Sequence, residues 1–593
     1  CFPMWLYQPA VRKHDLPMLQ LLVAACLAIG DGGAGEDLAA DPYGATPEAV
    51  ADAGVASDAP ISLPPQGGLS PTPDPLPLPP PPPPSDAERR DGKPEFVKGE
   101  LSMYLGSDRL AVKNTRIGVA AGLDRFLDSY YALIEPMVDL RLFDAKLGIG
   151  IGVPLRIEIV NLAQLDGKPF ANAGRLRIED YDTFHDFGRI LKYVTYGRKE
   201  DQIYVSAGQR YASSIGHGAI TRRYSPSINP DYPRASAQVD MYNDYGGFEL
   251  MTNDLLEWNQ LSGLAFFKPL SFFKPQNLLA KTFSIGVTGG LDWAAPFTIS
   301  ADQYKARVGV DGRPLVTSMK PAALIGFDAE LKVVKTDTVD IKPYVDYSLL
   351  FGGDGGFTAG VLGRFNVAAS REVVHAFRLV VEARFLGSRY APSYFDTFYE
   401  VDRFAYLNKD YRTDQGVGAG NYIPKQRYLL ETGLTQRFGY YVEGSWGVRN
   451  VVGLTLALEG TSASPAVNFV AHLEVPVLSF VQVFGSYYLR GVESWTELGT
   501  PNFPGRQGVI GLFGDKSIAF AGARLKILPI LFLNGRVYKT FRVNADLGRF
   551  DNQFGFAVDL EIGYEFRKAE PAPPPKEEPS PAQGSAMGSS AMR

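Results

Sequence analysis

Cysteine is nearly absent from this sequence: its 593 residues include two, Cys1 and Cys26, and none follows Cys26. The main body of the chain therefore has neither a disulfide framework nor a thiolate metal site. Long apolar runs are also missing, because no stretch of about 18 uncharged apolar residues occurs. This excludes an ordinary membrane-spanning helix.

Histidine is scarce as well, and its spacing matches no catalytic or metal-binding motif. The five histidines are His14, His185, His217, His375 and His472. None lies in the His-Glu-x-x-His spacing of zinc hydrolases. Ser213, Ser214 and His217 are close in sequence, but a turn that leads into a strand explains them better than a hydrolase does. We expect no enzyme activity, no catalytic residue, no cofactor and no metal.

Charged residues make up only 21% of the chain, and the formal net charge is −6. Nucleic-acid-binding proteins need a basic surface. Nucleic acid is therefore not expected as a partner.

The most regular pattern in the sequence is the alternation between Ala132 and Val160. Every second residue is apolar up to Leu142, and the alternation resumes at Leu147 after a turn at Asp144. Side chains two apart on a strand share a face, so this stretch predicts a β-hairpin with one apolar face. The second arm is longer than most strands of soluble proteins and long enough to cross a membrane.

The last predicted strand repeats this pattern. Its apolar residues alternate with small or charged ones and are Phe554, Phe556, Val558, Leu560, Ile562, Tyr564 and Phe566. Here the chain resembles the outer-membrane β-barrel proteins of Gram-negative bacteria, which typically close with such a strand ending in an aromatic residue. In this sequence Arg567 and Lys568 follow the aromatic residue. The resemblance implies an all-β fold, a large closed antiparallel transmembrane β-barrel of about 18–22 strands with disordered N- and C-terminal tails.

Composition divides the chain into four parts. Residues 1–35 read as an export signal, either a plain secretory signal or a lipoprotein signal with its lipid on Cys26. Residues 36–95 are Pro-rich and too poor in bulky apolar residues to fold. They are interpreted as a linker or as a periplasmic spacer that contacts the cell wall or an inner-envelope partner. Residues 96–568 are the predicted barrel, and residues 569–593 are a Pro-rich disordered tail.

Predicted connections alternate between short and long along the second half of the chain. In outer-membrane barrels the short turns face the periplasm, so both chain ends are expected there if the strand count is even. Residues 173–179 and 216–223 are predicted as strands, 426–447 as one strand or two, and 181–196 as a short helix because their apolar residues have helical spacing.

If the apolar faces point to lipid, the alternate residues point into the lumen. The predicted lumen-lining charges are Glu135, Asp139, Arg141, Arg156, Glu158, Lys342, Asp346, Arg378, Glu382, Arg384, Asp559, Glu561 and Glu565. They have two interpretations: an electrostatic filter for solutes, or salt bridges that stiffen or fill a closed barrel.

A second candidate site is the aromatic-rich loop 387–425. Its candidate binding residues are Tyr390, Tyr394, Phe395, Phe398 and Tyr399. Aromatic faces can stack on sugar rings, and the resemblance allows such a loop to fold into the lumen. The alternative is self-packing at the external membrane interface. Arg222 and Arg223 are interpreted as a lipid headgroup contact or part of a solvated face.

These features together predict a porin-like outer-membrane channel for the passive passage of small hydrophilic solutes. Its expected surroundings are outer-membrane lipid and lipopolysaccharide. The alternatives are a barrel that exports a polymer such as polysaccharide, and a closed barrel that serves adhesion or envelope anchoring.

Overall fold

The computed structural model describes residues 115–566, apart from 144–145, 162–166, 198–200, 210–211, 229–231, 274–275, 303–304, 310–312, 370–373, 407–422, 449–450, 476–479, 493–515 and 545–548. The predicted export signal (1–35), Pro-rich segment (36–95) and C-terminal tail (569–593) lie outside the described residues.

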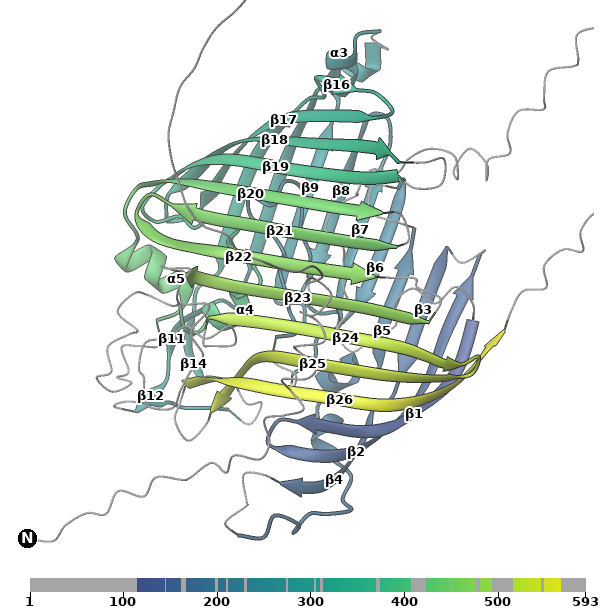
Figure 1. The fold of residues 1–593 in the computed structure, drawn as a ribbon. Helices are drawn as coiled ribbons and strands as arrows, with labels where there is room; N and C mark the ends of the chain where they lie inside the picture. Colours follow the sequence, from purple (N-terminus) through teal and green to yellow (C-terminus); the bar gives the residue numbers. More distant parts are fainter. Residues whose placement is uncertain are drawn as a thin grey trace, which may run out of the picture. The chain divides into compact units, whose positions relative to one another are not determined.

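Long antiparallel strands form the wall of the structure (Figure 1). In chain order they are β1 (Thr115–Phe126), β2 (Ser129–Leu142), β3 (Leu147–Gly152), β4 (Leu155–Asn161), β5 (Leu191–Tyr196), β6 (Ile203–Gly208), β7 (Ser236–Tyr242), β8 (Gly246–Thr252), β9 (Gln260–Phe267), β10 (Ser284–Asp292), β15 (Ala322–Glu330), β16 (Val334–Lys335), β17 (Val339–Leu350), β18 (Gly355–Ala368), β19 (Val374–Leu386), β20 (Arg437–Val448), β21 (Val452–Thr461), β22 (Ser464–Val475), β23 (Val481–Val492), β24 (Ser517–Leu528), β25 (Leu531–Asn544) and β26 (Arg549–Phe566).

The connections contain short elements only. Two small sheets pair β11 (Pro296–Ile299) with β14 (Val316–Met319) and β12 (Ala301–Asp302) with β13 (Lys305–Ala306). The helical turns are η2 (Ile178–Asp180), η3 (Phe184–Arg189), η4 (Pro269–Phe273), α3 (Leu278–Thr282), α4 (Tyr399–Asp402), α5 (Lys425–Arg427) and η7 (Tyr428–Thr432). Among the described residues, no helix is long and apolar enough to cross a membrane.

The sheet closes on itself because β1 pairs with both β2 and β26. Segments β3 and β4 both pair with β2 and form one strand interrupted near Pro154. Segments β15 and β16 are likewise both paired with β17. The 22 segments thus form a closed antiparallel barrel of 20 strands. This confirms the predicted fold class.

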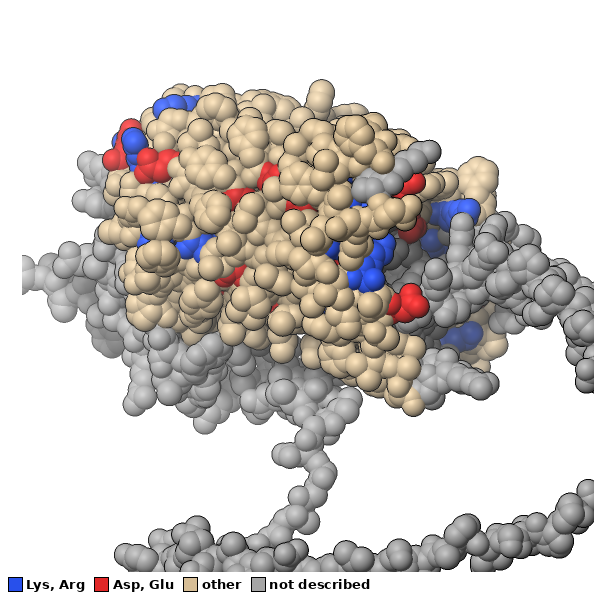
Figure 2. Space-filling model, turned by 90° about the horizontal axis from the view of Figure 1, so that it is seen from above, with Lys and Arg blue, Asp and Glu red and all other residues tan. Residues whose placement is uncertain are grey.

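The wall keeps the alternation that the sequence predicts. On β1, Ile117 is 51% exposed and Val119 is 47% exposed. Arg116, which precedes Ile117, is fully buried. The exposed set is apolar and faces outward, and the buried set carries most of the charge. Figure 2 shows one side of the wall, most of which is uncharged.

The connections at the two ends of the barrel differ in length. Thr115 lies opposite Phe566, and at that end most links are short, such as 336–338 and 529–530. The opposite end carries the long links 162–190, 209–235 and 387–436. It lies to the left in Figure 1, where α4, α5 and β11 are labelled. One link at the end that holds Thr115 and Phe566, 268–283, is also long and carries η4 and α3.

Three local predictions are wrong. Residues 173–179 form turns, a single bridge from Leu176 to Ile157 and the start of η2. Residues 216–223 form no strand, because Gly216 and Gly218 have φ angles of +56° and +84°, which are incompatible with extended structure. In 181–196 the helix is confined to η3, and β5 follows it. The stretch 426–447 contains one strand, β20, preceded by the helical turns α5 and η7.

The largest apolar cluster lies inside the barrel. It joins wall residues such as Leu324 and Leu350 to residues of two long connections, including Ile220 and Tyr394, which are each fully buried. A barrel of this width leaves an aqueous channel unless something fills it. Here segments of the chain itself occupy part of the lumen.

Candidate functional site

Residues 212–228, between β6 and β7, form what we call the luminal segment. Its backbone and side chains contact inward-facing residues of several strands. The Gly216 amide donates to Oε2 of Glu249 on β8 (2.9 Å). The hydroxyl of Thr221 lies 2.7 Å from that of Ser262 on β9. The luminal segment also contacts β15, β17, β19 and β20, which come much later in the sequence.

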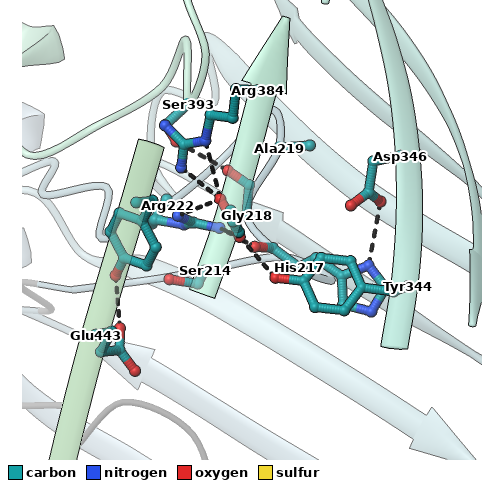
Figure 3. Close-up of polar contacts among 12 residues, drawn as sticks. Ser214, His217, Gly218, Ala219, Arg222, Tyr344, Asp346, Arg384, Ser393 and Glu443 are labelled. Carbon is teal, nitrogen blue, oxygen red and sulfur yellow. Dashed lines mark hydrogen bonds and ion pairs between the residues drawn. The ribbon is translucent and has the colours of Figure 1, made fainter. Parts of the chain in front are cut away.

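His217 fixes the luminal segment to β15 and β17. Its Nδ1 lies 3.1 Å from Oδ1 of Asp346, and its Nε2 lies 2.8 Å from Oε2 of Glu330. Its ring stacks on Tyr344 with 3.9 Å between centroids (Figure 3). Burial alone would lower the pKa of His217, but the carboxylates of Asp346 and Glu330 raise it to about 9.

Arg222 and Arg223 fix the luminal segment to β19 and β20. Arg222 donates two hydrogen bonds to Glu382, at 2.5 and 3.2 Å. Its guanidinium also lies 4.0 Å from the ring centre of Tyr441. Arg223 forms an ion pair with Glu443, which also accepts a hydrogen bond from the Tyr441 hydroxyl (2.6 Å). These arginines are buried, which corrects their interpretation as a headgroup contact or solvated face.

Residues 387–406, which we call the aromatic loop, pack against the luminal segment. Tyr390, Tyr394, Phe395, Phe398 and Tyr399 are all at most 7% exposed. The Phe395 amide donates to the Ile220 carbonyl, and the Arg222 amide donates to the Phe395 carbonyl, each at 3.0 Å. The aromatic faces are therefore used in packing, and none of these five rings is presented to solvent for stacking on a sugar.

Charged residues of the aromatic loop are also held inside the barrel. The Tyr399 hydroxyl donates to Oδ2 of Asp292 on β10 (2.7 Å), and Arg403 lies 3.1 Å from the same oxygen. Glu400 lies 2.8 Å from Arg234. Burial would raise the pKa of Glu400, but Arg234 and Arg403 together lower it below its usual value.

A cavity remains beside the luminal segment. Its volume is about 100 Å³, and its lining includes residues of β1, β2, β4, β5 and β25 and Ser227 of the luminal segment. Its charged lining residues are Asp124, Glu135, Arg156, Arg189, Lys192 and Arg536. A space of this size can hold several water molecules beside these charged side chains.

The structure places the charges singled out in the sequence on the inward side of the wall, and most are paired. Asp139 pairs with Arg116 (2.9 Å) and Glu561 with the same arginine (2.7 Å). The other pairs are Glu135 with Lys192, Arg156 with Asp124, Lys342 with Glu330, Asp346 with His217, Arg378 with Glu443, Glu382 and Arg384 with each other, and Asp559 with Arg536. Arg141, Glu158 and Glu565 are half-buried.

Sequence reasoning missed the luminal segment. Its signal was a pair of glycines, Gly216 and Gly218, between the apolar residues Ile215 and Ile220. Such a connection is much longer than a hairpin needs. Glycines flanked by buried apolar residues within a long loop indicate a packed segment better than they indicate a strand.

No protein-family model matches this chain. No curated protein matches it either. Among solved structures, the chain is similar to the ferric enterobactin receptor PfeA of Pseudomonas aeruginosa, with 8% identity, TM-score 0.31 and coverage of 77% of this chain and 82% of that one. It is also similar to Wzi of Escherichia coli, an outer-membrane protein involved in capsule assembly and a carbohydrate-binding β-barrel, with 10% identity, TM-score 0.27 and coverage of 78% and 86%.

A third similar structure is the siderophore receptor PirA of Acinetobacter baumannii, with 8% identity, TM-score 0.25 and coverage of 77% of this chain and 81% of that one. These neighbours are outer-membrane β-barrel proteins of Gram-negative bacteria. At such low scores the likeness does not indicate what this chain binds or transports.

Proposed function

We propose that this chain is a porin-like outer-membrane channel for small hydrophilic solutes, with the luminal segment and the aromatic loop as its internal constriction. The apolar outer face supports a membrane location, since a closed barrel satisfies every backbone hydrogen bond within lipid. Thr115 and Phe566, the first and last described residues, lie at the end with the short turns, and in such barrels the short turns face the periplasm. Lipid and lipopolysaccharide would then surround the wall.

The observation that carries the proposal is the cavity of about 100 Å³ with a charged lining beside the luminal segment. A barrel that only anchors a protein needs no more than about eight strands, whose interior side chains alone can fill. This barrel has 20 strands. Its wide lumen is lined by charged side chains and divided by segments that are held through polar contacts. These features are expected of a channel whose pore diameter is set by segments inside the barrel.

Conductance across planar lipid bilayers tests the proposal. The full-length protein, refolded into detergent and added to a bilayer, should produce discrete current steps. Neutral solutes of increasing size should reduce the step size until they no longer enter the pore. A correctly folded protein, shown by strand-dominated circular dichroism and heat-modifiable gel migration, that gives no steps would overturn the channel function.

A closed barrel that serves adhesion or anchoring is the second candidate, and one observation favours it. Arg222 and Glu382 are buried in an ion pair that joins the luminal segment to the wall. Buried ion pairs resist separation. A folded protein that produces no current steps in planar bilayers would therefore favour this candidate. Export of a polymer would require both internal segments to leave the lumen.

A further inference from the structure

We infer that His217, Asp328 and Asp346 form a binding site for a divalent cation of the zinc type, which ties the luminal segment to β15 and β17. The three side chains each offer one ligand atom, and these atoms lie within 4.8 Å of one another. One imidazole with carboxylates is a ligand set that suits zinc and similar first-row cations. This inference does not depend on whether the lumen conducts.

Two carboxylate oxygens of the cluster have no hydrogen-bond partner among the described residues. They are Oδ2 of Asp328 and Oδ2 of Asp346, and both atoms are buried. The Asp346 side chain as a whole is only 8% exposed. Buried carboxylate oxygens without partners are costly. A cation between them would supply the missing interaction.

The charges of the cluster also call for a divalent cation. Asp328, Glu330 and Asp346 bring three negative charges, and Lys342, which lies 2.5 Å from Glu330, brings one positive charge. With the imidazole neutral, as a metal ligand must be, the three carboxylates and Lys342 leave two net negative charges, which one divalent cation balances.

The surroundings position the ligands for such a site. Tyr344 stacks on the His217 ring at an interplanar angle of 16° and fixes its plane. Gly286 of β10 makes room for the Asp328 carboxylate, since a Cβ at this glycine would lie 2.4 Å from Oδ2. Ligand atoms of tetrahedral zinc are about 3.4 Å apart. Small side-chain rotations therefore bring the three ligand atoms to binding distance.

Zinc binding to the purified full-length protein in detergent tests this inference. The protein is stripped with a chelator, and zinc is then titrated by calorimetry at pH 8. We expect one site in the wild type and at least a tenfold loss of affinity in Asp328→Asn. Asp328 forms no hydrogen bond or ion pair through its side chain with the described residues, so this substitution removes a ligand without breaking either. Zinc should also raise the melting temperature of the wild type but not that of the variant.

Two further variants separate this site from incidental zinc binding. His217→Gln should lose the site as Asp328→Asn does. His375→Gln should retain it, because His375 lies on β19 and accepts a hydrogen bond from Trp446. No zinc binding in the wild type, or equal binding in the wild type and Asp328→Asn, would overturn the inference. Neither result bears on conductance, so the channel function is tested separately.

Discussion

Arg222 and Glu382 lie 160 residues apart in the sequence, yet the Arg222 guanidinium donates two hydrogen bonds to the Glu382 carboxylate inside the barrel. Glu382 also accepts hydrogen bonds from Arg384 and from the Tyr344 hydroxyl (2.7 Å). One carboxylate of the wall thus holds both a neighbouring wall side chain and the luminal segment. The first prediction depends on separating these two roles.

Replacing Arg222 should loosen the luminal segment. Arg222→Gln removes a buried ion pair, with a cost of at most about 3–5 kcal/mol because Arg384 and Tyr344 still contact Glu382. Its conductance in planar bilayers should exceed that of the wild type. Arg384→Gln is the matched control, since Arg384 pairs with Glu382 from the same strand. It should lower heat stability without raising conductance. Equal conductance in the two variants would contradict the assigned role of Arg222.

The outward face of β18 should show a dependence on membrane depth. Val361 and Val367 lie on the same face of this strand and are 45% and 54% exposed. Val361 is near the middle of the strand and Val367 near its end. Val361→Arg should destabilise the barrel by about 2–4 kcal/mol, and Val367→Arg by about 0–1 kcal/mol. Urea titrations in lipid vesicles measure both values. Equal losses of unfolding free energy in the two variants would indicate that this face does not contact lipid.

The lumen is narrow beside Gly150. A Cβ at this position would lie 2.2 Å from a ring carbon of Tyr193, whose hydroxyl donates to Oδ1 of Asp139 (3.0 Å). Because that hydrogen bond holds the ring, Gly150→Ala should destabilise the barrel by about 1–3 kcal/mol through overpacking. Gly444→Ala is the control, since nothing lies within 4 Å of an added Cβ there. A similar urea midpoint for both variants would mean that Tyr193 moves aside freely.

The docking of the aromatic loop should weaken in acid through Glu400. Its pKa is lowered in the folded protein. The carboxylate therefore contributes stability above its unfolded pKa of about 4.3, and this contribution is lost as the pH falls through the folded value. Glu400→Gln should lower the melting temperature at pH 7 and have a smaller effect near pH 3.

Glu431→Gln is the matched control for this pH dependence. Glu431 lies in the same long connection and pairs with Arg427, but both side chains are more than 40% exposed. Exposed ion pairs contribute little to stability, so this variant should follow the wild type at every pH. A Glu400→Gln effect that is the same at pH 7 and pH 3 would argue against the buried carboxylate as its source.

The wall of the barrel was predictable because strand periodicity is a local property. Ile149 and Ile151 alternate with Gly148 and Gly150, and a closed sheet with one apolar face is the arrangement that satisfies this pattern over many strands. The lengths of the connections followed from the same pattern. The inward position of residues such as Glu382 and Asp559 also follows from it, since a strand has only two faces.

Periodicity did not reveal what fills the lumen. The alternation predicts a strand over 216–223, but the positive φ angles of Gly216 and Gly218 are incompatible with one, and Ile220 packs inside the barrel instead. The partners of Arg222 and Arg223 are wall carboxylates 160 and 220 residues away.

The sequence by itself therefore determined the wall, its faces and its ends, all of which depend on residues close together along the chain. Only the tertiary structure decided that His217, Arg222 and the aromatic loop occupy the lumen and pair its charges. Whether an inward carboxylate meets water or an arginine depends on which distant segment the closed barrel encloses. No local pattern of residues carries that information.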